Sequence, residues 1–107
     1  MSRRVMVRYK VKPDQAARNE ELVRGVYEEL HRTRPAGIRY ATFRLDDGVS
    51  FVHIASVETD DGRNPLQDVA AFGRFQENVR ERCDGAPVSG ELHEIGSFRF
   101  LDDAGEP

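Results

Sequence analysis

The chain has 107 residues, 38% hydrophobic and 33% charged, a balance that predicts one globular domain over residues 1–107. Its formal net charge of -3 predicts no polybasic surface, so we expect neither nucleic acid nor an anionic membrane as a partner. Cys83 is the only cysteine, which excludes an intramolecular disulfide and favours the reducing cytoplasm, and no apolar run approaches the roughly 18 residues that span a bilayer.

The first predicted elements are a strand and a long helix. Residues 5–11 alternate apolar and polar side chains, which is the two-residue period of a half-buried strand. A helix is predicted over about residues 14–34, with Asp14 as its N-cap and Pro35 just beyond its end. Its apolar face has the three- and four-residue spacing of an amphipathic helix and consists of Leu22, Val23, Val26, Tyr27 and Leu30.

The remaining elements complete a βαββαβ order. Residues 38–45 and 49–57 flank an Asp-Asp-Gly turn and predict an antiparallel hairpin. A second helix is predicted over 66–83, and a last strand over 91–101 precedes an acidic tail at 102–107, which we expect to be frayed. This order predicts an α+β, ferredoxin-like fold with an antiparallel sheet and both helices on one face.

The strand at residues 49–57 is apolar on both faces, so two layers must cover it. One face carries Phe51, His53, Ala55 and Val57. We expect this face to point away from the helices, with Val52 and Ile54 toward them. Because only two helices are predicted, a second copy of the chain is expected to cover the remaining apolar face. The prediction is a homodimer that encloses a cavity lined by His53.

The sequence is compatible with two registers of the hairpin. A three-residue loop places Phe43 on the same face as Phe51, with Ala41 beside His53. A two-residue loop places Arg44 beside Phe51 and Thr42 beside His53 instead. The choice matters because a slip of one residue turns every side chain of a strand to the other face.

Together these features resemble the dimeric α/β barrel superfamily, in particular small antibiotic biosynthesis monooxygenase-like proteins. The matching segments are Phe51-Val52-His53-Ile54, the second helix with its preamble from Asn64-Pro65-Leu66 to Ala71-Phe72-Gly73-Arg74-Phe75-Gln76, and the closing Gly96-Ser97-Phe98-Arg99-Phe100 strand. The resemblance covers nearly the whole chain. It implies a homodimer whose lumens, between sheet and helices of each half, hold small aromatic or polyketide-like substrates. Characterised members oxidise such substrates with dioxygen and without metal or flavin, so it implies no cofactor.

Other members of that superfamily degrade haem, but this chain lacks tryptophan and therefore the full Asn/Trp/His set of those enzymes. His31 and His93 have no metal-ligand spacing with His53, so no metal site is expected. Cys83 lies on the apolar stripe of the second predicted helix and is interpreted as a core residue.

His53 is the leading candidate for a catalytic residue. Burial lowers the pKa of a histidine and keeps the ring neutral near pH 7, so that it can accept a proton from a phenolic or enolic substrate. The alternative is a structural histidine that hydrogen-bonds to the backbone or to its symmetry mate.

Candidate substrate-binding residues surround this histidine in the predicted fold. Tyr9 and Tyr40 could present hydroxyl groups, and aromatic walls could come from Phe43, Phe51 and Phe72, with Phe75 beside them. Arg44 could bind an anionic substrate, as could Arg99 at the adjacent end of the last strand. For each of these residues plain packing or surface solvation is the competing interpretation.

Two functional hypotheses follow from the residues and the resemblance. The first is a cofactor-independent monooxygenase that acts on an aromatic or polyketide-like substrate in the barrel lumen. The second is a non-catalytic ligand-binding or accessory protein on the same dimeric scaffold. A cavity with convergent polar groups around His53 would support both, whereas a lumen filled by Phe and Leu side chains would remove both.

Overall fold

The computed structural model describes residues 2–100, and it has the predicted α+β, ferredoxin-like fold. In chain order the elements are β1 (Arg3–Lys10), the 3₁₀ turn η1 (Pro13–Gln15), α1 (Ala16–Thr33), β2 (Ile38–Arg44), β3 (Ser50–Val57), the 3₁₀ turn η2 (Pro65–Asp68), α2 (Ala70–Gln76), α3 (Val79–Arg82) and β4 (Val88–Leu92). The strands form one antiparallel sheet in the order β2-β3-β1-β4.

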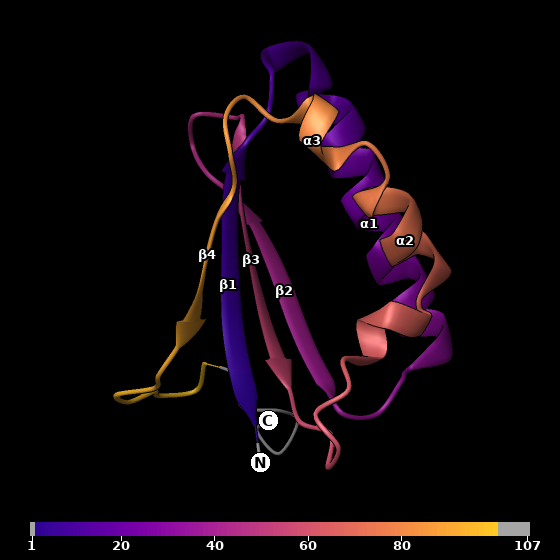
Figure 1. Cartoon of the computed structure of the whole chain (residues 1–107), viewed down its shortest axis with the longest axis vertical. Coiled ribbons are helices and arrows are strands. Elements are labelled where there is room, and N and C mark those ends of the chain that lie inside the picture. The colour runs from indigo at the N-terminus through magenta and orange to yellow at the C-terminus, as the bar shows by residue number, and fades with distance from the viewer. Residues whose placement is uncertain (1, 101–107) are drawn as a thin grey trace.

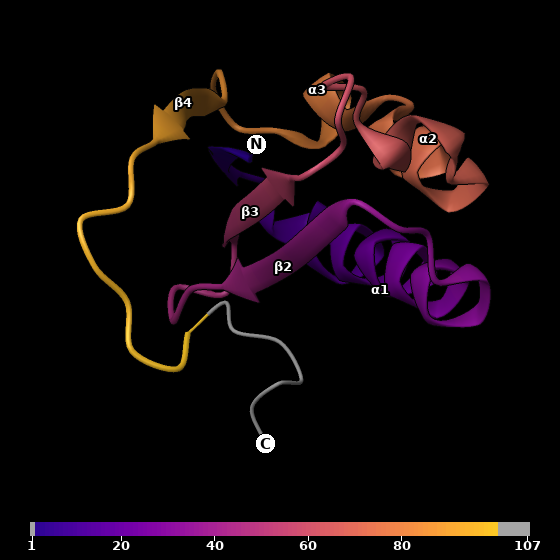
Figure 2. The ribbon, with the colours of Figure 1, turned by 90° about the horizontal axis from the view of Figure 1, so that it is seen from below.

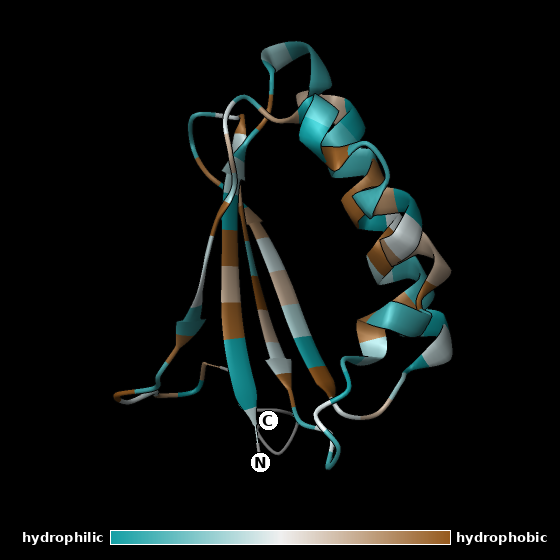
Figure 3. Ribbon diagram, in the orientation of Figure 1, coloured by the Kyte–Doolittle hydropathy of each residue, from teal (hydrophilic) through white to brown (hydrophobic). Residues whose placement is uncertain are grey.

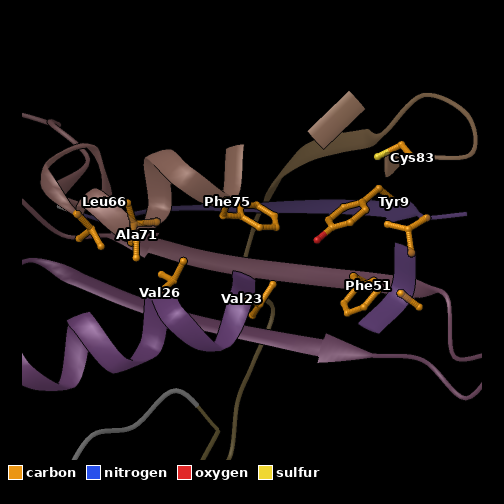
Figure 4. Packing of buried hydrophobic residues seen from close by; sticks show 11 residues of the cluster. Tyr9, Val23, Val26, Phe51, Leu66, Ala71, Phe75 and Cys83 are labelled. Carbon is orange, nitrogen blue, oxygen red and sulfur yellow. The ribbon is translucent and has the colours of Figure 1, made fainter. Parts of the chain in front are cut away.

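All the helices lie on the same side of this sheet (Figure 1). The apolar positions of α1 and α2 turn toward the strands, as the brown segments on the inner side of the helices show (Figure 3). The core between the two layers includes Val26 of α1, Leu66 of η2, Phe75 of α2 and Phe51 of β3, each at most 6% exposed. Figure 4 shows these side chains, with the Tyr9 ring, in the space between the ribbons.

The first helix begins later than the sequence pattern indicated. Asp14 lies in the turn η1, and Gln15 is the N-cap of α1 without a side-chain cap, so the prediction of Asp14 as N-cap was wrong. Pro13 occupies the first position of the tight turn, which its fixed φ angle favours. The helix ends as predicted before Pro35, with Arg34 in the left-handed region at φ 48°.

The second predicted helix is divided into three pieces. Its first turn is η2, α2 stops at Gln76, and α3 begins at Val79 after Asn78, whose φ angle is +58°. Two backbone carbonyls near this break, those of Phe75 and Glu77, accept hydrogen bonds from the Arg82 guanidinium at 2.6 and 3.0 Å. The break therefore supplies acceptors for a buried charged side chain.

The last strand was predicted in the wrong place. Pairing runs from Arg8 opposite Val88 to Arg4 opposite Leu92, and β1 begins at Arg3, so residues beyond Leu92 soon have no neighbouring strand to pair with. Residues 93–100 consequently leave the sheet on the side away from the helices (Figure 2). The predicted end of this strand at Leu101 and the acidic tail at 102–107 lie outside the described residues.

The hairpin adopts the register of an even-numbered loop. Thr42 lies opposite His53 and Arg44 opposite Phe51, so the alternative with Phe43 and Ala41 beside them is excluded. Asp47 fixes the turn, because its carboxylate accepts hydrogen bonds from the backbone N–H groups of Val49 and Ser50.

The face of β3 that carries His53 points toward the helices, and the opposite prediction was wrong. Phe51, His53, Ala55 and Val57 are at most 6% exposed within the single chain. Val52 and Ile54 lie on the other face of the sheet, which none of the helices within residues 2–100 covers. Any cavity beside His53 therefore lies within a single chain, between its sheet and its helices, as the family resemblance had implied.

Candidate active site

A pocket of about 210 Å³ lies between the sheet and the elements η2, α2 and α3. Most of its lining is apolar. The polar residues of the lining lie on β1, β2 and β3, at the N-cap of η2 and at the end of α2. The residues around it are Val5, Val7, Tyr9, Tyr40, His53, Ala55, Asn64, Leu66, Phe72, Phe75, Gln76, Val79 and Pro87. The second predicted outcome, a lumen filled by side chains, is thus excluded.

His53 stands at the polar wall of this pocket with both ring nitrogens engaged. The Tyr9 hydroxyl lies 2.8 Å from Nε2, and the Tyr40 hydroxyl lies 2.6 Å from Nδ1. The Thr42 hydroxyl is a second neighbour of Nδ1 at 3.1 Å. Because Tyr9 and Thr42 occupy strands on either side of β3, the sheet itself fixes these distances.

Aromatic rings enclose the histidine from several directions. The Tyr9 ring is stacked on it at a centroid distance of 5.3 Å, and the Phe75 ring from α2 lies at 5.3 Å in a tilted arrangement. Phe72 contacts Phe75 at 6.2 Å and meets the edge of Tyr40 at the same distance. These rings form an apolar wall against which a flat aromatic molecule could pack.

Burial shifts the acidities of the site's titratable groups. It lowers the pKa of His53 from 6.5 to about 4, because the charged imidazolium would lose its water. It raises the pKa of Tyr9 to about 12, and it raises that of Tyr40 still further. At neutral pH the wall of the pocket therefore consists of a neutral imidazole between two neutral phenols.

The polar wall continues behind Tyr9 into the helical layer. The Asn19 side-chain amide donates to the Tyr9 hydroxyl at 2.9 Å, and its carbonyl oxygen accepts from Nε of Arg82 at 3.0 Å. Asn19 is fully buried and Arg82 is 6% exposed. A chain of hydrogen bonds therefore joins the guanidinium of α3 to the imidazole of β3 through α1 and β1.

On the opposite side of His53 the series of hydrogen bonds continues through Thr42 to the crevice between α1 and β2. The Tyr27 hydroxyl lies 2.8 Å from the Thr42 hydroxyl, and both residues line a shallow depression with Glu20 and Arg44. Burial raises the pKa of Tyr27 to about 12. Arg44 contributes no charge to the main pocket, because its guanidinium pairs with Glu20 and donates to the Gly48 carbonyl.

The structure brings together some of the predicted site residues and not others. His53, Tyr9, Tyr40 and Phe72 line the pocket, with Phe75, while Phe51 lies directly behind the Tyr9 ring at 5.6 Å. Phe43 is 46% exposed on the open face of the sheet, so its placement beside a substrate is corrected, as is that of Arg44. Arg99 lies outside any strand and stacks on Phe98.

Sequence reasoning missed the residues that hold the polar wall in place. Asn19 lies four residues before Val23 and seven before Val26, so a helical plot places this amide on the buried stripe. Arg82 likewise lies seven residues after Phe75 in the sequence. A polar residue at a core position was the available signal in both cases. Asn64 was quoted only as part of a motif, and its carbonyl oxygen caps η2 through the N–H of Leu66.

Within residues 2–100 no cluster of three or more His, Cys, Asp or Glu side chains is arranged to hold a metal ion. Across the same range, no helix is long and apolar enough to cross a membrane. Cys83 is buried in the core as predicted, and burial raises the pKa of its thiol.

Comparison with known proteins finds similarity at the level of structure. No family model matches the sequence, and no curated protein matches it either. Among solved structures, SnoaB from Streptomyces nogalater, a cofactor-independent oxygenase, superposes with a TM-score of 0.65 at 17% identity, over 92% of this chain and 98% of SnoaB. Rv0793 from Mycobacterium tuberculosis superposes with a TM-score of 0.66 at 16% identity, over 91% and 98%.

A structure described as an antibiotic biosynthesis monooxygenase superposes with a TM-score of 0.69 at 16% identity, over 90% of this chain and all of its own. At identities this low the likeness establishes the fold alone. The chain therefore has the fold of the antibiotic biosynthesis monooxygenase proteins, and the resemblance read from its sequence is confirmed at that level.

Proposed function

We propose that this protein is a cofactor-independent oxygenase that oxidises a small hydroxylated aromatic compound in the pocket beside His53. The observation that carries the proposal is a neutral imidazole held between two tyrosine hydroxyls at the polar wall of an otherwise apolar pocket. The description of SnoaB as a cofactor-independent oxygenase supports the reaction class.

The size and lining of the pocket indicate the ligand. A cavity of about 150 Å³ is enough to bind benzene in other proteins, so the 210 Å³ found here suits a molecule of about one or two rings. Phe72 and Phe75 offer ring faces for stacking, and Tyr40 offers a hydroxyl at the polar wall. A naphthol meets both requirements and serves as a probe.

The reaction balances without an external reductant. A naphthol and dioxygen give a naphthoquinone and water: one oxygen atom enters the new carbonyl group, and the other leaves with the two hydrogens of the substrate's C–H and O–H bonds. The electrons come from the substrate ring. A substrate proton would reach His53 through the hydroxyl of Tyr9, which lies 2.8 Å from the ring nitrogen Nε2.

A second candidate function is ligand binding without turnover. The observation that favours it is the pKa of about 4 at His53, because a general base works best when its pKa is near the working pH. Under this proposal the same aromatic ligand binds the pocket but is released unchanged.

Oxygen uptake distinguishes the two candidates. The protein is incubated with naphthol in the presence of a metal chelator, and dioxygen consumption and quinone formation are measured together. The oxygenase consumes one dioxygen per quinone, and His53→Gln lowers the rate by a factor of about a hundred or more. The matched control Arg32→Gln changes an exposed residue of α1 that does not line the pocket, and it keeps the rate.

Saturable naphthol binding without oxygen uptake would favour the ligand-binding function. Absence of binding by one- and two-ring aromatic compounds would overturn both candidates.

We also propose that the protein is a homodimer in which a second copy covers the open face of the sheet. The centre of that face carries Met6, Val52 and Ile54, with Phe43 46% and Val88 63% exposed toward its edges. Beyond β4, Ile95 and Phe98 are also largely exposed. Arg4 and Arg8 lie among these apolar side chains on the same face. A group of exposed apolar side chains of this kind usually marks an interface. The interface and the pocket would then lie on opposite faces of the same sheet.

A further inference from the structure

The hydrogen-bond chain behind Tyr9 has a direction that its chemistry determines. Arg82 carries only donors, since a guanidinium has five N–H groups and no acceptor. Its Nε lies 3.0 Å from Asn19, so the Asn19 atom that faces it must be the carbonyl oxygen. The amide nitrogen of Asn19 must then face Tyr9, to which it donates at 2.9 Å.

This orientation decides what Tyr9 can do. Its oxygen accepts the hydrogen bond from Asn19, so its own hydrogen is left for the other neighbour, Nε2 of His53 at 2.8 Å. The reverse arrangement, with Nε2–H donating to Tyr9, would leave a buried tyrosine hydrogen without an acceptor, which folded proteins avoid. Nε2 is therefore the acceptor, and the single proton of the neutral ring resides on Nδ1.

The consequence reaches the pocket through Tyr40. Nδ1–H donates to the Tyr40 oxygen at 2.6 Å, with Thr42 as a more distant acceptor at 3.1 Å. The hydrogen of Tyr40 is not used by His53 and remains for Thr42 or for an occupant of the pocket, which Tyr40 lines. Where this hydrogen turns from Thr42 toward an acceptor in the pocket, the polar wall offers a donor to the ligand.

We propose that Arg82, which does not itself line the pocket, is a positioning residue: acting through Asn19 and Tyr9, it fixes His53 as the Nδ1–H tautomer. Tyr40 then presents its O–H to the ligand, so the pocket selects a molecule with a carbonyl or other acceptor oxygen at that point. The tautomer concerns the resting protein, whereas the ligand preference rests on the proposed function of the pocket.

Burial and the break between α2 and α3 support this role for Arg82. The guanidinium is 6% exposed, and all three of its hydrogen-bond acceptors are uncharged: the Asn19 side chain and the carbonyls of Phe75 and Glu77. The Phe75 ring lies beneath it at 5.4 Å. The side chain is thus held on several sides, which leaves Asn19 no freedom to turn its amide over.

Long-range proton–nitrogen correlation NMR at neutral pH measures the tautomer without any ligand, because the two ring nitrogens resonate differently according to which one carries the proton. The wild type is expected to show Nδ1–H at His53. The exposed His31 and His93 provide internal references in the same spectrum. A wild-type ring that carries its proton on Nε2 would overturn the proposal.

Asn19→Asp should reverse the direction of the hydrogen bonds from residue 19 through Tyr9 to His53, with almost no change in the shape of the side chain. The new carboxylate accepts from Arg82 and also from the Tyr9 O–H, so Tyr9 becomes an acceptor for Nε2–H and the tautomer switches. Adding Tyr9→Phe cuts the connection, and the double variant should show the tautomer of Tyr9→Phe alone. An unchanged His53 spectrum in Asn19→Asp contradicts the assignment.

Variants of Arg82 test its part directly. Arg82→Lys keeps a group that only donates and is expected to retain Nδ1–H, whereas Arg82→Met frees the amide and should give both tautomers. Retention of Nδ1–H alone in Arg82→Met would remove Arg82 from the proposal. If Arg82→Met does not fold, the Asn19→Asp comparison still decides the direction of the chain.

Two probes of equal shape test the ligand preference: indane and indanone, which differ by one carbonyl group. NMR titration gives the dissociation constants of both probes, and their ratio is compared between wild type and variant. Differences in the hydration of the free probes cancel in this comparison. The preference for indanone should fall about threefold to tenfold in Tyr40→Phe and in Asn19→Asp, the effect of one neutral hydrogen bond. An unchanged ratio would overturn the preference but not the tautomer, and failure of both probes to bind would count against the pocket's proposed function.

Discussion

On its helix side the sheet presents Tyr9, Tyr40 and His53 among apolar neighbours, and every one of these polar groups has a hydrogen-bond partner. On its other side the strands present Met6, Val52 and Ile54, with Arg4 and Arg8 on either side of Met6 along the internal strand β1. Both faces carry large apolar side chains. Only the helix side keeps a series of hydrogen-bonded polar side chains away from water.

The two faces differ in a property that hydropathy alone does not distinguish, namely whether buried polar groups must be enclosed. Buried polar groups cost free energy unless they are paired, so a face that keeps several of them must pair them with fixed geometry. The helix side achieves this with residues from β1, β2, β3 and α1. Under the proposed homodimer the open side meets only another protein surface, which sets no such requirement.

The comparison is tested most strongly by removing one phenylalanine from each face. Phe51→Ala empties a position that is 2% exposed, and it should lower the free energy of unfolding by about 3–5 kcal/mol. Phe43→Ala on the open face, at a site that is 46% exposed, should cost less than about 1 kcal/mol in dilute protein. Chemical denaturation at matched concentrations measures both, and equal losses would contradict the assignment of the two faces.

A charge at the centre of the open face sharpens the comparison further. Ile54→Glu should weaken self-association by about a hundredfold or more, because a carboxylate from each copy would lose its water in the interface. Gln67→Glu adds the same charge at an exposed position of η2 and should leave association unchanged. Light scattering coupled to size exclusion reports the outcome. A wild type that remains monomeric at high concentration would overturn the homodimer before either variant is made.

Much of the fold could be predicted from the chain because its periodicities are strong. The alternation in β1, the long stripe of α1 and the hairpin around Asp46-Asp47-Gly48 gave the element order, which the structure confirms. The direction of His53 could not be predicted in the same way. Since β3 is apolar on both faces, a two-residue period does not tell which face the helices will cover.

The site was only partly predictable for a related reason. Tyr9, Tyr40 and His53 are residue types that invite a functional interpretation, whereas Asn19 and Arg82 lie 63 positions apart and meet only in the fold. The interruption between α2 and α3 contains no proline that would mark it in the sequence, and carbonyls beside it accept hydrogen bonds from Arg82. Local patterns do not record such long-range demands.

Acid should affect the helix side first. The pKa of His53 is about 4 in the folded chain and about 6.5 when unfolded, so the unfolded state binds the extra proton between these values and stability falls as the pH drops. From pH 7 to pH 5 the loss should be about 2 kcal/mol. His53→Gln removes the titrating group and should flatten this part of the profile. Denaturation midpoints measured across that range test the prediction, and parallel profiles would show that His53 is not buried as a neutral ring.

The smallest expected effect concerns the hydroxyl pair between α1 and β2. Tyr27 and Thr42 lie 2.8 Å apart, so a double-mutant cycle with Tyr27→Phe and Thr42→Val should give a coupling free energy of about 0.5–1.5 kcal/mol. Because Thr42 also neighbours Nδ1 of His53, Thr42→Val alone should slightly shift the ring's NMR signals, whereas Tyr27→Phe should not. A coupling near zero would mean that this end of the polar chain is open to water, and the helix side would then resemble the open face more than the structure indicates.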